Sequence, residues 1–315
     1  MELSNSVVLV TGASSGIGAA TARAASRAGA RVVLAARRQD RVRRLAAGLG
    51  DALAVGCDVT DAGQVADAVR AATEKFGRLD VLVNSAGQGL TAPVEETGPA
   101  DFRAILDLNL TAPLITMQAV LPVMRAQGGG AIVNVSSGTV FSVLPLSGAY
   151  AASKQGLAVL SATARLELAG TGIVVSTFYP FVTSTEFAGS VKAGKEAAAQ
   201  MMSDGGLKAQ PPELAADAII DLIRSGAEQA DMVPQQFGGT RSMALVISPS
   251  GRSMYCPEQD DPRPRSSAAG QGWSPTRAIA RVSGTPSISR LVIVAARAPR
   301  VPFDRSLSAM ANTTP

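Results

Sequence analysis

Histidine is absent from the 315-residue chain, and cysteine is scarce. An imidazole serves as base or ligand in Ser-His-Asp hydrolysis, in Cys-His proteolysis and in most zinc sites, so the sequence excludes these classes of chemistry. Cys57 and Cys256 are too few and too far apart to form a disulfide framework or a thiolate metal site. We therefore expect no bound metal and no disulfide-stapled fold.

The sequence also lacks the marks of a secreted or membrane-spanning chain. Its first residues, MELSNSVVLVTG, carry an acidic side chain where a signal peptide is basic, and the apolar run VVLV is too short for a signal. No unbroken apolar stretch comes near the roughly 18 residues that a spanning helix needs. Hydrophobic residues make up 46% of the chain, which is enough to bury a core. We expect a cytoplasmic protein without a membrane partner.

Charge is distributed unevenly along the chain. Residues 240–315 hold ten arginines, no lysine and four acidic residues, a net charge of +6; since the whole chain carries +4, residues 1–239 carry −2. A nucleic-acid-binding domain places its basic residues on a folded recognition face. Because the basic excess here lies in a segment without regular pattern, no nucleic-acid partner is predicted.

Residues 1–239 alternate short apolar runs with longer stretches of helical composition. Buried strands that alternate with helices are typical of a parallel sheet covered on both faces. The sequence thus predicts an α/β fold, a Rossmann-type doubly wound sheet in a single domain. In such sheets ligands bind at the carboxyl ends of the strands, where the strand order reverses. The predicted strands are residues 7–10, 32–36, 52–55, 79–83, 131–135 and 173–178.

The first predicted strand leads into a glycine-rich octet, TGASSGIG, at residues 11–18. Gly12, Gly16 and Gly18 permit a tight strand-to-helix turn and let a pyrophosphate approach the backbone. A glycine-rich turn without a ligand is the alternative interpretation. The position of the octet between a first strand and a helix favours a bound dinucleotide.

The second predicted strand ends in VVLAARR, with Ala36 where an NAD site usually has an acidic side chain for the adenosine ribose. Arg37 and Arg38 follow, and guanidinium groups bind phosphate bidentately. We therefore predict NADP(H) as the cofactor in preference to NAD(H). The alternative is that both arginines only solvate the start of a helix.

The segment SGAYAASKQGL places Tyr150 and Lys154 four residues apart in a stretch of helical composition. Side chains at this spacing share a helix face, so the ammonium can lie near the phenol and lower its pKa from about 10. A phenol with a lowered pKa suits general acid/base catalysis. The alternative is that Tyr150 is an ordinary half-buried aromatic residue.

With these motifs in order, residues 5 to 225 or so resemble the classical short-chain dehydrogenase/reductase (SDR) family. The further matching motifs are CDVTD with Asp58, NSAG at residues 84–87, DLNLTAP with Asn109, and IVNVSSG with Ser137. The resemblance implies a nicotinamide cofactor, and it implies that Asn84 mainly ties the central strands together. Besides the residues already named, the implied cofactor contacts are Ser14, Ser15, Ile17, Val59, Asn84, Ala86, Gly87, Pro180, Thr183 and Thr185, with Tyr150 and Lys154.

For a reduction, the resemblance implies hydride transfer from the nicotinamide to a carbonyl carbon while Tyr150 protonates the oxygen. Ser137 would hydrogen-bond that oxygen, Lys154 would bind the nicotinamide ribose, and Asn109 would hold a water that links Lys154 to solvent. In the alternative interpretation, Ser137 only ends a strand and Asn109 only bonds helix backbone. The alternative function is a non-catalytic NADP-binding sensor or scaffold on the same fold.

The chain departs from the family pattern after the last predicted strand, where Pro180-Phe181 stands in place of Pro-Gly. A phenylalanine restricts the backbone and is expected to put a ring near the nicotinamide end of the cleft. Together with Val143 and Leu144, Phe181 predicts an apolar pocket. The predicted substrate is therefore a small hydrophobic ketone, aldehyde or secondary alcohol.

The next two segments have different compositions. The first, AGSVKAGKEAAAQMMSDGGLKAQPPE, is interpreted either as a lid over the cofactor or as a plain surface helix. The second, PPELAADAIIDLIRSG, has prolines near its start and a glycine at its end, which predicts an amphipathic helix.

Residues 240–315 lie outside the predicted catalytic domain, which spans residues 1–239. Scattered proline, serine, glycine and arginine without a sustained period predict a disordered or incidental tail. An oligomer-bracing extension and a shifted reading frame are the alternatives. We expect a chain that ends at Gly239 to keep its cofactor binding. The family resemblance further implies a homodimer or homotetramer, with helices around residues 100–125 and 150–169 at the interface.

Overall fold

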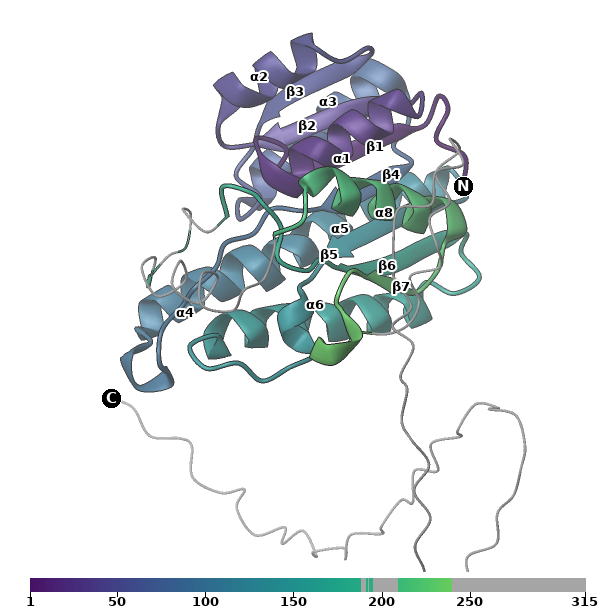
Figure 1. The fold of residues 1–315 in the computed structure, drawn as a ribbon. Coiled ribbons are helices and arrows are strands. Elements are labelled where there is room, and N and C mark those ends of the chain that lie inside the picture. Colours follow the sequence, from purple (N-terminus) through teal and green to yellow (C-terminus); the bar gives the residue numbers. More distant parts are fainter. Residues whose placement is uncertain (188–190, 192, 195–208, 240–315) are drawn as a thin grey trace, which may run out of the picture. The chain divides into compact units, whose positions relative to one another are not determined.

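Figure 1 shows the computed structural model, which describes residues 1–187, 191, 193, 194 and 209–239. The predicted tail lies outside the described residues, as does most of the predicted lid. Within the described residues, seven strands form one parallel sheet in the order β3-β2-β1-β4-β5-β6-β7. The strands are β1 (Val7–Thr11), β2 (Arg31–Ala36), β3 (Ala52–Gly56), β4 (Val81–Asn84), β5 (Gly130–Val135), β6 (Ile173–Tyr179) and β7 (Gln229–Asp231). This order confirms the predicted Rossmann-type doubly wound α/β fold.

Strand β7 was not among the predicted strands, because its three residues, Gln-Ala-Asp, form no apolar run. It pairs with the end of β6 at the edge of the sheet, where Thr177 lies opposite Gln229. The six predicted strands all coincide with strands of the sheet. A short polar edge strand of this kind is specified by its neighbour rather than by its own sequence.

Helices cover both faces of the sheet (Figure 1). Val8 and Val10 of β1 pack into one apolar cluster with α1 and α8, while Val7 and Leu9 pack into a second cluster with α3 and α5. This division follows from the alternation of side chains along a strand. The helices are α1 (Gly16–Arg27), α2 (Gln39–Ala47), α3 (Ala62–Phe76), α4 (Pro99–Leu106), α5 (Ala112–Ala126), α6 (Gly148–Glu167) and α8 (Pro212–Ser225).

The helix boundaries agree with local sequence signals. Asp61 caps α3 by accepting hydrogen bonds from the backbone N–H groups of Gly63 and Gln64, and the helix ends at Gly77 with a φ of 78°. Helix α8 has Pro211 as its N-cap and Pro212 as its first residue, and its C-cap is Gly226, which has a φ of 64°. The predicted helix in PPELAADAIIDLIRSG is therefore present.

Helices α4 and α5 belong to one helical run, Pro99–Ala126, of 28 residues, which contains an 18-residue window of mean hydropathy 1.4. By length and composition alone this run could cross a membrane, although the sequence has no unbroken apolar stretch of that length. In the described fold 39% of its apolar window is buried, and Met117, Val120 and Met124 pack against the sheet. The run therefore has the packing of a core helix.

The strand order reverses at β1. The chain proceeds from β1 to β2 on one side and returns to β4 on the other, so that Thr11 at the end of β1 lies between Ala35 and Asn84. The connections that leave these strand ends run in opposite directions, which opens a crevice between them. Apart from Asn109, which lies between α4 and α5, the predicted site residues lie at or after the ends of β1, β2, β3, β4, β5 and β6.

Candidate active site

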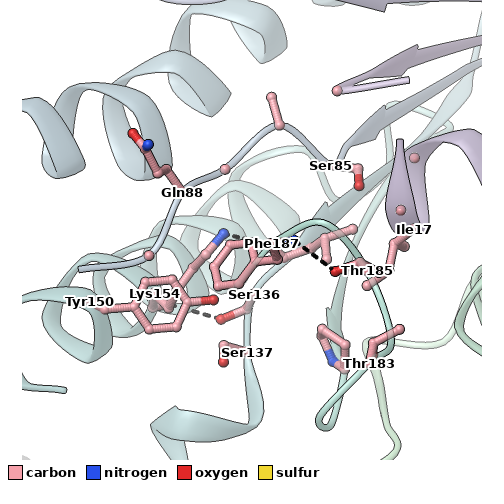
Figure 2. A pocket seen from close by; sticks show the side chains of 18 of the residues that line it. Ile17, Ser85, Gln88, Ser136, Ser137, Tyr150, Lys154, Thr183, Thr185 and Phe187 are labelled. Carbon is pink, nitrogen blue, oxygen red and sulfur yellow. Dashed lines mark hydrogen bonds between the residues drawn. The ribbon is translucent and has the colours of Figure 1, made fainter. Parts of the chain in front are cut away.

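A cleft of about 640 Å³ lies at the carboxyl ends of the strands. It is lined by residues that follow β1, β2, β3, β4, β5 and β6, together with the start of α6. Every predicted site residue contributes to its lining except Asn84 and Asn109. Figure 2 shows Ser137, Tyr150, Lys154 and Phe187 gathered in one part of this cleft.

The glycine-rich turn is packed so closely that two of its glycines are required by the fold itself. A Cβ on Gly12, whose φ is +67°, would lie 2.8 Å from the backbone nitrogen and Cα of Ala86. A Cβ on Gly18 would lie 2.6 Å from the carbonyl oxygen of Gly12. The turn thus brings the start of α1 against the ends of β1 and β4, and leaves bare backbone facing the cleft.

This turn fits the pyrophosphate of a dinucleotide. Ser15 is the N-cap of α1 and makes no side-chain capping hydrogen bond, so the amide groups of the first helical turn lack a side-chain acceptor from that residue. Backbone N–H groups at a helix N-terminus attract phosphate. Ser14, Ser15, Gly16 and Ile17 all line the cleft here.

Arg38 reaches back from the start of α2 to the glycine-rich turn. Its Nε and Nη2 donate to Ser14 Oγ at 3.1 and 2.9 Å, and Nη2 also donates to Ser15 Oγ at 2.7 Å. Although Arg38 is the N-cap residue of α2, its side chain makes no capping bond to that helix. Its guanidinium therefore lines the cleft beside the start of α1.

Arg37 and Asp58 form the other side of this end of the cleft. The backbone N–H and hydroxyl of Thr60 donate to Asp58 Oδ1 at 3.0 and 2.8 Å. These hydrogen bonds, with the positive charge of Arg37, hold the pKa of Asp58 below its usual range. Asp58 is thus a charged acceptor at the mouth of the cleft, where the family resemblance implies an adenine contact.

Tyr150 and Lys154 project from the first turns of α6, and Lys154 is buried. Lys154 Nζ donates to the carbonyl oxygen of Val135 at 2.9 Å, and Ser136 Oγ donates to the carbonyl oxygen of Lys154 at 2.9 Å. These two hydrogen bonds join α6 to the end of β5. Burial lowers the pKa of Lys154 to about 8.

The pKa of Tyr150 differs from the sequence-based expectation. Burial raises it to about 12, while a hydrogen bond with Ser137 acts in the opposite direction. The expected lowering by Lys154 is not present in the protein without cofactor. The physical reason is that desolvation of the phenolate outweighs the stabilising contacts, and that Lys154 Nζ is hydrogen-bonded to a backbone carbonyl.

Ser137 lies directly beyond β5 and is oriented by its neighbour Thr139. The backbone N–H of Thr139 donates to Ser137 Oγ at 3.2 Å, and the Thr139 hydroxyl donates to it at 3.0 Å. Because both contacts use the oxygen as an acceptor, the hydroxyl proton of Ser137 is available to a second oxygen. Tyr150 is such a partner in this structure.

Asn109 lies behind the cleft in a π-helical turn, Asp107–Thr111, between α4 and α5. Its Nδ2 donates to Gln88 O at 2.9 Å and to Ser153 Oγ at 3.0 Å, while its Oδ1 accepts from Gln88 N at 3.0 Å. The side chain is fully buried and does not line the cleft. It fixes the loop after β4 to the helix that carries Tyr150.

Asn84 likewise lies outside the cleft lining, although it is among the predicted cofactor contacts. Its Nδ2 donates to Asn134 Oδ1 at 2.9 Å, and Thr116 Oγ1 donates to its Oδ1 at 2.8 Å. Asn134 in turn donates to Ser161 at 2.8 Å. This buried network joins β4, β5, α5 and α6, as the expected structural role of Asn84 requires.

Phe181 lines the cleft, as predicted, together with Phe237. Its ring stacks on Phe237 with 5.5 Å between centroids, and Val143 is fully exposed and does not line the cleft. Leu144 does line it, as do Pro180, Thr183 and Thr185. Thr183 Oγ1 donates to Phe181 O at 2.8 Å, which shapes the turn after β6.

Two residues that sequence reasoning did not select also line the cleft. The ring of Phe187 lies 5.7 Å from that of Tyr150, and Glu186 binds the guanidinium of Arg38. Both residues come directly after Thr185, a predicted cofactor contact. Their position next to it in the sequence could have identified them as candidates for the cleft. The cleft is thus more aromatic than predicted, because Phe187 lies beside Tyr150 in addition to the predicted Phe181.

The strand order and the glycine-rich turn at the switch point define a doubly wound dinucleotide-binding protein. A family model described as short chain dehydrogenase matches residues 6–196. The chain belongs to the short-chain dehydrogenase/reductase family, whose members are oxidoreductases that bind a nicotinamide cofactor and act on small molecules.

Three known proteins illustrate the relationship. D-threitol dehydrogenase of Mycolicibacterium smegmatis is 39% identical over 223 residues, which cover 69% of this chain and 86% of that protein. The 3-ketoacyl-(acyl-carrier-protein) reductase from Brucella melitensis, complexed with NADH, has a TM-score of 0.66 at 26% identity and covers 73% of this chain and 97% of its own. The alcohol dehydrogenase from the archaeon Thermococcus sibiricus, complexed with 5-hydroxy-NADP, has a TM-score of 0.63 at 27% identity. The match covers 72% of this chain and 95% of that protein.

Proposed function

We propose that this protein is an NADP-dependent oxidoreductase that interconverts a carbonyl compound and an alcohol. The observation that carries the cofactor preference is the end of β2, where Ala36 offers no carboxylate and Arg37 and Arg38 line the cleft. A free ribose 2′-hydroxyl needs an acceptor that Ala36 does not supply. A 2′-phosphate needs cations, which both arginines supply.

When bound, the cofactor supplies the hydride that adds to the carbonyl carbon. Tyr150 donates its phenolic proton to the carbonyl oxygen, and Ser137 donates a hydrogen bond to the same oxygen as charge develops there. Thr139 keeps Ser137 Oγ in place through its two hydrogen bonds. The raised pKa of Tyr150 keeps the phenol protonated before reduction.

Lys154 and Asn109 each have a supporting role in this reaction. Lys154 places its ammonium on the same helix face as Tyr150, where it would bind the nicotinamide ribose. Both functional groups of the Asn109 side chain are bonded to Gln88 and Ser153. These hydrogen bonds fix the loop after β4 to α6, so Asn109 acts as a positioning residue.

The proposed substrate is a hydrophobic ketone, aldehyde or secondary alcohol. Leu90, Leu144 and Phe187 line the cleft with Tyr150, which supports an apolar binding surface. The relative named D-threitol dehydrogenase instead suggests a polyol as the competing substrate class. A substrate panel decides between them: turnover of threitol and other small polar polyols alone would rule out the hydrophobic class.

A homodimer or homotetramer is proposed on the basis of exposed apolar side chains. Leu114 on α5, and Val159 and Leu166 on α6, are 36%, 59% and 78% exposed. These helices are the ones that the family resemblance places at an interface. Sedimentation of the wild type and of Val159→Glu tests this: the proposal requires a larger wild-type assembly that the charged variant weakens.

Turnover by Tyr150→Phe tests the catalytic part of the proposal. We expect kcat for NADPH-dependent carbonyl reduction to fall by about 10² to 10⁴, the range typical of a lost general acid, while NADPH affinity stays within about twofold. Tyr179→Phe is the matched control, because Tyr179 is a buried tyrosine outside the cleft lining. A wild-type protein that binds NADPH but turns over no carbonyl or alcohol would favour a non-catalytic binder.

A further inference from the structure

A carboxylate from the turn after β6 binds the arginines at the opposite side of the cleft. Glu186 Oε2 accepts from Arg38 Nη1 at 2.8 Å, and Arg41 Nη1 donates to both carboxylate oxygens at 2.7 Å. Arg38 precedes α2 and Arg41 lies in its first turn. Glu186 therefore connects two segments that are about 150 residues apart in the sequence.

Four of the five N–H groups of Arg38 donate hydrogen bonds in this arrangement. Nε and Nη2 bind Ser14 and Ser15, and Nη1 binds Glu186. A carboxylate and a phosphate use the same donors of a guanidinium. Since two anions at one arginine also repel each other, a phosphate that binds Arg38 competes with Glu186.

The contacts of Glu186 with the two arginines compete with a phosphate for Arg38, and a phosphate can displace them. The side chains of Arg38, Arg41 and Glu186 are 44%, 38% and 55% exposed, so solvent screens the ion pairs. The hydrogen bonds with Arg38 and Arg41 hold the pKa of Glu186 below its usual value, which keeps the carboxylate charged at neutral pH. The charge at this end of the cleft is therefore less positive than Arg37, Arg38 and Arg41 alone would make it.

We infer that Glu186 is a specificity-determining residue for the cofactor, whose carboxylate occupies Arg38 and Arg41 until a ribose 2′-phosphate displaces it. This inference rests on the proposed use of NADP. A 2′-phosphate has to break the contact between Glu186 and Arg38, whereas an unphosphorylated ribose leaves it intact. The arginines make the protein bind NADP(H) more tightly than NAD(H), and Glu186 reduces this difference in affinity.

The experiment is calorimetric titration of the full chain with two cofactor fragments, adenosine 2′,5′-bisphosphate and 5′-AMP. Glu186→Gln keeps the size of the side chain and removes its charge. Because exposed ion pairs contribute up to about 1 kcal/mol, we expect this variant to bind the bisphosphate about three- to fivefold more tightly and to leave 5′-AMP within about twofold. Glu95→Gln, an exposed glutamate outside the cleft lining, makes the same change in net charge and should alter neither affinity.

Arg38→Ala separates this inference from the proposed function. We expect it to weaken the bisphosphate by at least about tenfold and 5′-AMP much less, since hydrogen bonds to charged groups contribute about 1.5–3 kcal/mol. If Arg38→Ala behaves so while Glu186→Gln changes neither affinity, or changes both equally, the role of Glu186 is refuted and the NADP preference stands. If Arg38→Ala leaves both affinities unchanged, the NADP preference fails and the inference fails with it.

Discussion

The buried ammonium of Lys154 makes the stability of this protein depend on pH in a specific way. Lys154 is 4% exposed, and its Nζ donates to a neutral carbonyl, Val135 O. Desolvation lowers its pKa from 10.5 to about 8. A shift of this size corresponds to about 3 kcal/mol of free energy between the two protonation states.

The direction of the effect follows from proton binding. Above pH 8 or so the folded state has released the Lys154 proton, whereas the unfolded chain keeps it until pH 10.5. The unfolded state then binds more protons, so the free energy of unfolding rises with pH in this window. Below pH 8 both states are protonated, and this stabilisation is lost.

Lys154→Met removes the titrating group and keeps most of the volume. We expect the free energy of unfolding of the wild type, relative to that of Lys154→Met, to rise by about 2 kcal/mol between pH 8 and pH 10, because most of the shift lies in that interval. The measurement is urea denaturation followed by circular dichroism at several pH values. The raised pKa of Tyr150 acts at higher pH and in both proteins, so it largely cancels from the difference. A difference that stays constant from pH 8 to pH 10 would refute the depressed pKa of Lys154.

Two further predictions concern the packing that holds the cleft. Gly18→Ala should destabilise the protein by about 1–2 kcal/mol despite the better helix propensity of alanine, because its Cβ meets the Gly12 carbonyl oxygen at 2.6 Å. The measurement is urea denaturation, with Gly148→Ala as the control, because a Cβ on Gly148 makes only an ordinary van der Waals contact. A Gly18→Ala variant as stable as this control would contradict the close approach of residue 18 to the Gly12 carbonyl oxygen. Asp80→Ala should lower the free energy of unfolding by about 3 kcal/mol. The buried Asp80 carboxylate accepts a hydrogen bond from Val7 N at 2.8 Å, and its removal leaves that amide without this partner. An unchanged melting temperature would contradict this prediction.

The sequence was sufficient to predict the elements that carry strong local signals. The six apolar strands, the glycine-rich turn and the helix with Tyr150 and Lys154 all lie where their patterns indicate. The cap at Asp61 likewise depends only on residues of the same turn. These features are local, and parallel strand order then brings their ends to one edge of the sheet.

Side-chain direction depends on packing and was less predictable. The ring of Phe181 stacks on Phe237, a residue 56 positions further along the chain, and local sequence does not predict this contact. The side chain of Asn109 is buried because it projects from a π-helical turn and its amide hydrogen-bonds to the backbone of Gln88. The contact of Glu186 with Arg38 could not be predicted either, since it joins exposed residues of two distant loops.

The most direct test of the account is a titration of the purified full chain with NADPH and with NADH, because it needs no knowledge of the substrate. We predict that NADPH binds more tightly than NADH, and that Arg37→Ala weakens NADPH binding while affecting NADH little. Equal or tighter binding of NADH, or no binding of either nucleotide, would contradict the assignment of this cleft to NADP.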